Sequence, residues 1–66
     1  MSVDEMKEFC RGVKAYQLRV QIRMKDEREI HTGKIEGVDN DHLHLLTDDQ
    51  VQMPLRYAWI ARIKNG

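Results

Sequence analysis

The chain has 66 residues, a mass of 7.8 kDa and eleven residues of each charge, so its formal net charge is zero. A chain of this length forms one domain, residues 1–66, and buries only ~60% of the surface that its unfolded form exposes. We therefore expect self-association to bury additional surface. The neutral charge excludes binding of nucleic acid through a bulk basic field, and the single cysteine excludes an intrachain disulfide.

The first predicted element is a helix over about residues 3–12. Ser2 followed three residues later by Glu5 is typical of a capping box at its start. An apolar stripe follows at helical spacing: Met6, Phe9, Cys10 and Val13. We expect Gly12 to end the helix, which is too short to be stable unless it packs against the rest of the chain.

About residues 15–64 are predicted to form a barrel of short antiparallel strands. The first strand has the clearest alternation, and its apolar members are Tyr16, Leu18, Val20, Ile22 and Met24. A second strand begins at Ile30, and its apolar parity shifts at Gly33, which predicts a bulge or sharp bend there.

Three further strands complete the prediction. The third places Leu43 and Leu45 on the core side, the fourth contains the alternating Val51, Met53 and Leu55, and the fifth covers about residues 59–63. Pro54 indicates that the fourth strand lies near an edge of the sheet or that it is close to its end at this residue. The predicted fold class is mostly β: an N-terminal helix and a five-stranded, strongly bent antiparallel open barrel.

Two segments carry series of residues that are typical of a known family. The first series joins hydrophobic residues, a glycine and an aspartate: Val20, Ile22, Met24, Ile30, Gly33, Ile35, Val38 and Asp39. The second joins a hydrophobic residue and an arginine to the last strand: Leu55, Arg56, Tyr57, Ala58, Trp59 and Ile60. With the helix, these series resemble the Sm-like proteins, including the bacterial Hfq branch, over nearly the whole chain.

This resemblance implies both an assembly and a function. It implies an SH3-type barrel whose fourth and fifth strands pair with those of neighbouring subunits, giving a homo-oligomeric ring of about five to seven subunits. It also implies binding of single-stranded, U- or A-rich RNA at sites repeated around the pore. The corresponding role is RNA chaperoning or post-transcriptional regulation.

The resemblance also suggests site residues in the loop that follows Asp39. Allowing one extra residue in this loop places His42 at the base-stacking position and His44 at the base-edge position. This alignment keeps Leu43 and Leu45 on the core side. Asn40 lines the same loop.

Two more site residues come from the second series. Arg56 matches the motif arginine that holds the RNA, and its guanidinium suits phosphate or base contacts. Tyr57 stands where Sm proteins have glycine and Hfq proteins have histidine, and it could stack on a base.

Each site residue also has a structural interpretation. The two histidines could be ordinary exposed strand residues, Arg56 could pair with Asp39 or Asp41, and Tyr57 could pack at a subunit contact. Asp41 would repel phosphate. The alternative function is therefore an oligomeric scaffold or protein-interaction module that keeps the ring without binding RNA.

Other classes of function lack support in the sequence. His42 and His44 give two potential metal ligands on one face, but two ligands make a weak site without a third. No metal or cofactor is therefore predicted. A ring would bring several copies together, so it could bind nickel or zinc adventitiously. Ser2 caps a helix and Cys10 lies on a packing stripe, so we expect no enzyme and no small-molecule substrate. The longest apolar run, residues 57–61, falls short of the ~20 residues that span a membrane. We expect a cytoplasmic protein.

Overall fold

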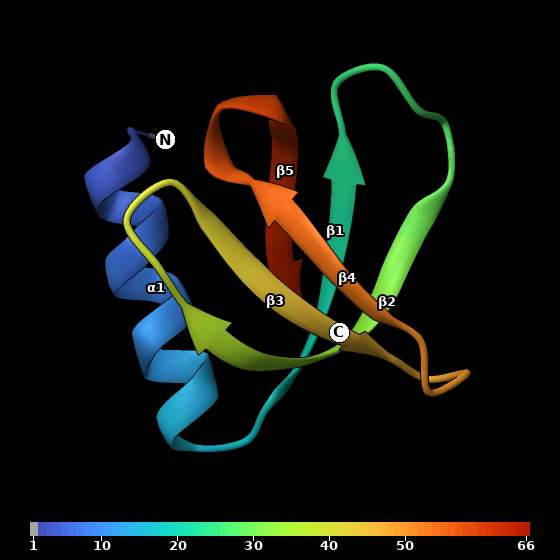
Figure 1. The fold of residues 1–66 in the computed structure, drawn as a ribbon, viewed down its shortest axis with the longest axis horizontal. Helices are drawn as coiled ribbons and strands as arrows, with labels where there is room; N and C mark the ends of the chain where they lie inside the picture. Colours follow the sequence, from blue (N-terminus) through green and yellow to red (C-terminus); the bar gives the residue numbers. More distant parts are fainter. Residues whose placement is uncertain (1) are drawn as a thin grey trace.

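The computed structural model describes residues 2–66, which form one helix and five strands in a single antiparallel sheet. The elements are α1 (Val3–Ala15), β1 (Arg19–Met24), β2 (Ile30–Val38), β3 (His42–Thr47), β4 (Gln52–Arg56), the 3-10 turn η1 (Tyr57–Trp59) and β5 (Ile60–Asn65). The strand order is β4-β3-β2-β1-β5, and α1 stands beside the bent sheet (Figure 1). The predicted fold class is confirmed. Within residues 2–66, no helix has the length and apolar character needed to cross a membrane.

The start of α1 follows the sequence prediction. The Glu5 amide donates to Ser2 Oγ at 3.2 Å, and the Ser2 amide donates to Glu5 Oε1 at 3.4 Å, so the capping box is complete. The predicted stripe faces the sheet, with Met6, Cys10 and Val13 buried. The helix therefore gains its stability from packing rather than from its length.

The end of α1 lies three residues beyond the predicted one. Gly12 sits inside the helix, and Gln17 ends it by adopting a left-handed conformation with φ 53°. The Leu18 amide then donates to the Val13 carbonyl at 2.9 Å, which satisfies an otherwise unpaired carbonyl of the last turn. A non-glycine residue in this conformation is uncommon, so the sequence pattern pointed to the wrong stop.

The core consists of the inward-facing residues of all five strands and of the helix stripe. Leu43 and Leu45 are fully buried, as alternation predicts. The apolar residues that alternation misplaced are exposed: Tyr16, Leu18, Ile30 and Val51. Tyr16 is 79% exposed because it caps the helix instead of starting a strand.

Gly33 allows β3 to approach β2 closely, but the predicted shift of parity at this residue is wrong. Gly33 pairs regularly with Val20 on one side and Thr47 on the other. The register shift falls instead between Ile35 and Gly37. A Cβ atom on Gly33 would lie 2.0 Å from the Leu46 carbonyl oxygen, so the close approach of β3 requires a glycine.

The two edges of the sheet are β4 and β5. The Thr47 amide donates to the Val51 carbonyl, and the Tyr57 amide donates to the Asp41 carbonyl. The backbone groups of the odd-numbered residues of β4 therefore bond to β3, and those of the even-numbered residues point to the free edge. Pro54 is therefore on the outward side, where it removes one donor from the free edge. This confirms the edge position predicted for the fourth strand.

Candidate functional site

The turn before β3 and the outer face of that strand bring together Asp39, Asp41, His42 and His44, here called the histidine–aspartate cluster. Inward-facing leucines at alternate positions fix the strand, so both histidine rings project from the opposite face. The rings meet edge to face, with centroids 4.8 Å apart. Alternation had predicted this shared face.

Carboxylates hold both rings of the cluster. Asp39 Oδ2 lies 2.8 Å from His44 Nε2 and 3.2 Å from His42 Nε2. His42 Nδ1 lies 2.5 Å from Asp41 Oδ1, and this hydrogen bond is the main reason why the pKa of Asp41 is lowered. Asp39 and Asp41 therefore place negative charge beside both histidine rings and make this surface poorly suited to phosphate groups.

Tyr57 supports the cluster from the core side. Its side chain is 1% exposed, and its hydroxyl donates to the Asp39 carbonyl at 3.0 Å. Burial raises the pKa of Tyr57 to about 12. The predicted base-stacking role of Tyr57 does not fit this placement, because no face of the ring is open to a base. Tyr57 instead packs in the core of the single chain, and its packing at a subunit contact stays a prediction.

Arg56 and Asn40 lie at the border of the cluster and are exposed. Arg56 pairs with His42 across β3 and β4, and its charge contributes to the lowered pKa of Asp41. Within residues 2–66, no carboxylate lies within 4.0 Å of Arg56, so the predicted ion pair with Asp39 or Asp41 does not form. The guanidinium is available to a partner.

The cluster also contains a third potential metal ligand, which the sequence analysis missed. Potential ligand atoms of Asp39, His42 and His44 all lie within 4.8 Å of one another. The absence of a third ligand was the reason for excluding a metal site, and that reason is wrong. The only local signal was the aspartate three residues before the first histidine.

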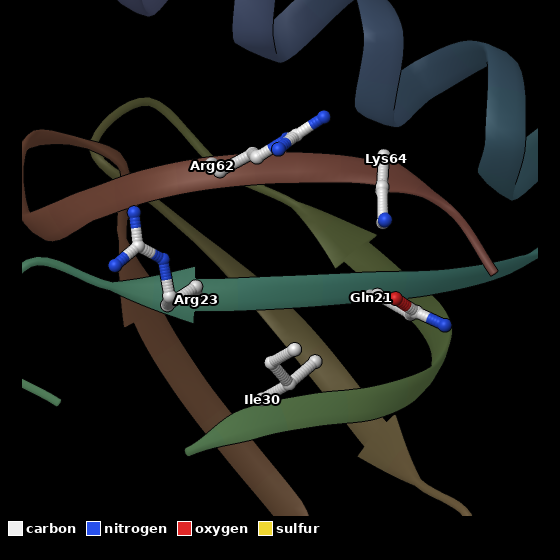
Figure 2. Close-up of a pocket in the computed structure, with 5 residues that line it drawn as sticks. All are labelled: Gln21, Arg23, Ile30, Arg62 and Lys64. Carbon is white, nitrogen blue, oxygen red and sulfur yellow. The ribbon is translucent and has the colours of Figure 1, made fainter. Parts of the chain in front are cut away.

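A second surface, also missed, lies on the outer face of β1, β2 and β5 and surrounds a hollow of about 100 Å³ (Figure 2). Its residues are Gln21, Arg23, Ile30, Arg62 and Lys64, here called the basic face. Arg23 lies directly opposite Arg62, and Gln21 lies opposite Lys64. The three cations come from two strands that are far apart in the sequence, so local charge patterns did not bring them together.

The basic face has no internal charge compensation. Within the described part of the chain, none of its three cations has a carboxylate within 4.0 Å. Ile30, which is 55% exposed, adds an apolar surface beside them. An otherwise neutral protein thus carries a local positive surface that suits an anionic partner.

Cys10 takes no part in either surface. Its side chain is fully buried in the packing stripe of α1, and burial raises the pKa of its thiol to about 11. A thiol with so high a pKa is a poor nucleophile at neutral pH. This placement agrees with the packing role expected from the sequence.

The fold is shared with a solved structure. The crystal structure of the pleiotropic translational regulator Hfq is similar to this chain with a TM-score of 0.79 and 18% sequence identity, over 91% of this chain and 97% of that one. The helix followed by five antiparallel strands is therefore the Hfq fold. Neither a scan of known protein families nor a search of curated proteins gives a match.

Proposed function

We propose that this protein forms a ring by pairing β4 of one subunit with β5 of the next, and that the ring binds single-stranded RNA. Its fold is that of a translational regulator, and both strands that would pair are free edges of the sheet. Closing a ring satisfies the hydrogen bonds of these edges and buries additional surface. Trp59, which is 59% exposed in the turn between the two strands, would gain burial at such a contact.

The observation that supports RNA binding best is the uncompensated charge of the basic face. Arg23, Arg62 and Lys64 can each reach a phosphate, and ring formation would repeat this weak site around the assembly. The histidine–aspartate cluster has the opposite character. We therefore assign the phosphate contacts to the basic face.

The residues predicted for base recognition, His42, His44, Asn40 and Arg56, belong to a separate contact beside the cluster. His44 and Arg56 are its most accessible planar groups, and planar groups can stack on unpaired bases. The pore position of this contact follows from the resemblance to Sm-like proteins. The affinity of this contact for RNA depends on how far the positive charge of Arg56 offsets the negative charges of Asp39 and Asp41.

Fluorescence anisotropy with labelled oligo-U and oligo-A tests the proposal. Because binding to phosphates releases counterions, the affinity must fall as salt rises, and the double variant Arg62→Ala/Lys64→Ala should reduce the salt slope by about 1.4, or about 0.7 for each lost contact to a single strand. Lys14→Ala, an exposed cation at the end of α1, is the matched control and should leave the slope unchanged. Arg56→Ala measures the second contact separately.

The competing function is a scaffold without RNA, which the two carboxylates of the cluster favour. A ring that shows no salt-dependent affinity for either oligonucleotide would establish the scaffold and refute RNA binding. If Arg56→Ala abolishes binding and the double variant of the basic face does not, the assignment of phosphates to the basic face is wrong.

A further inference from the structure

We propose that Asp39, His42 and His44 form a binding site for a divalent transition-metal ion, with Zn²⁺ as the reference ion. The two Nε2 atoms already converge on one carboxylate oxygen, at 3.2 Å and 2.8 Å. Ligand atoms about 2.0–2.1 Å from a tetrahedral Zn²⁺ are about 3.3–3.4 Å apart. The two nitrogen–oxygen distances are already close to this value, and all three ligand atoms lie within 4.8 Å of one another, so the histidine rings would have to draw together to surround an ion.

The backbone holds these ligands in place before any ion arrives. The Asp39 amide donates to the His42 carbonyl at 2.9 Å, which closes the turn between β2 and β3 and fixes the separation of two ligands. The buried Tyr57 hydroxyl holds the Asp39 carbonyl from below. His44 lies between Leu43 and Leu45, which are both buried, so the packing of the core fixes the position of this third ligand.

Two further residues orient the imidazole rings. Asp41 Oδ1 lies 2.5 Å from His42 Nδ1, so with the ring proton on Nδ1 this carboxylate would orient the ring and leave the Nε2 lone pair to an ion in place of its contact with Asp39. Metal-bound histidines commonly have such a carboxylate partner. Gly37 lies across from His44, and a Cβ atom there would come within 3.1 Å of its ring, so a glycine gives this ring its room.

The ligand chemistry selects the class of ion. Two imidazole nitrogens and one carboxylate oxygen suit Zn²⁺, Ni²⁺, Co²⁺ or Cu²⁺, whereas Mg²⁺ and Ca²⁺ prefer sites built from oxygen. Three protein ligands leave a fourth position open to water or to an exogenous donor. All three ligands come from one chain, so the site stands whether or not the protein binds RNA or forms a ring.

Titration calorimetry with Zn²⁺ on tag-free protein tests the site, and Co²⁺ absorption in the visible range reports its coordination. We expect one Zn²⁺ per chain and tetrahedral Co²⁺ bands. His44→Ala and Asp39→Asn should each abolish the bands and weaken Zn²⁺ binding at least tenfold. Asp41→Asn should keep the bands but weaken binding by about 10- to 100-fold, because it removes only the orienting group.

His31→Ala is the matched control, because His31 contacts Glu27, at 2.8 Å, rather than the cluster. It should bind Zn²⁺ as the unmodified chain does. Thermal melts without metal check that each variant is folded. Equal Zn²⁺ affinities for the unmodified chain and the folded His44→Ala variant would overturn the proposal, and so would octahedral Co²⁺ spectra that no substitution alters.

Discussion

Replacing Gly33 by alanine should destabilise the protein more than any other glycine substitution, whereas the same replacement at Gly12 should stabilise it. A Cβ atom on Gly33 would lie 2.0 Å from the Leu46 carbonyl oxygen and 2.7 Å from Thr47 Cα, both of which are backbone atoms. Neither can rotate away as a side chain does. β3 would have to retreat toward the ordinary contact distance of 3.4 Å or more, which disrupts its pairing with β2.

The magnitude follows from the two costs of this retreat. Overpacking costs about 1–3 kcal/mol, and each weakened ladder hydrogen bond costs about 1 kcal/mol. Their sum, about 2–4 kcal/mol, is a large share of the ~3–10 kcal/mol that stabilises a domain of this size. A Cβ atom on Gly12 would have no atom within 4 Å beyond its chain neighbours and the nearby backbone of its own helix, so alanine should add up to about 1 kcal/mol through its helix propensity.

Urea denaturation followed by circular dichroism, at one fixed protein concentration, measures both variants. A free energy of unfolding for Gly33→Ala within 0.5 kcal/mol of the unmodified chain, roughly the size of a neutral surface change, would refute the reasoning about β3. A loss of stability for Gly12→Ala would show that Gly12 ends the helix after all, as the sequence pattern alone predicts.

Two further predictions concern alkaline stability and the free edge. Burial raises the pKa of Cys10 from 9.0 to about 11 and that of Tyr57 from 10.0 to about 12. The stabilisation by their neutral forms is therefore complete below the unfolded-state pKa values of 9.0 and 10.0, and it is lost as pH rises through the folded-state pKa values of about 11 and about 12. Urea denaturation between pH 8 and about 12 should therefore show a decline that is smaller in Tyr57→Phe, and equal declines would contradict this reading. Pro54→Val should restore an outward donor to β4 and lower the dissociation constant of the oligomer in sedimentation velocity, whereas unchanged association would show that this edge is not used.

Alternation predicted the inner faces of the barrel because burial on one side of a strand imposes a period of two. Leu43, Leu45 and Ile22 are buried accordingly. The same rule failed where another constraint governed the residue. Tyr16 lies at a helix end, and Ile30 lies on an outer face among cations, so apolar character alone did not indicate burial for either residue.

The candidate sites depended more strongly on tertiary structure. The sequence could place His42 and His44 on one face, but the turn that carries Asp39 back to them is a property of the folded chain. Likewise, Arg62 and Lys64 meet β1 only through the antiparallel register of β5. Contacts between strands distant in sequence leave no local pattern, which is why the basic face emerged only from the structure.

Native mass spectrometry of the unmodified protein at micromolar concentration tests the central claim most directly, namely that free β4 and β5 edges close into a ring. The account predicts one dominant closed species of about five to seven subunits, in line with the size expected from the Sm-like resemblance. A stable, folded single chain, or a continuous ladder of open oligomers, would contradict it.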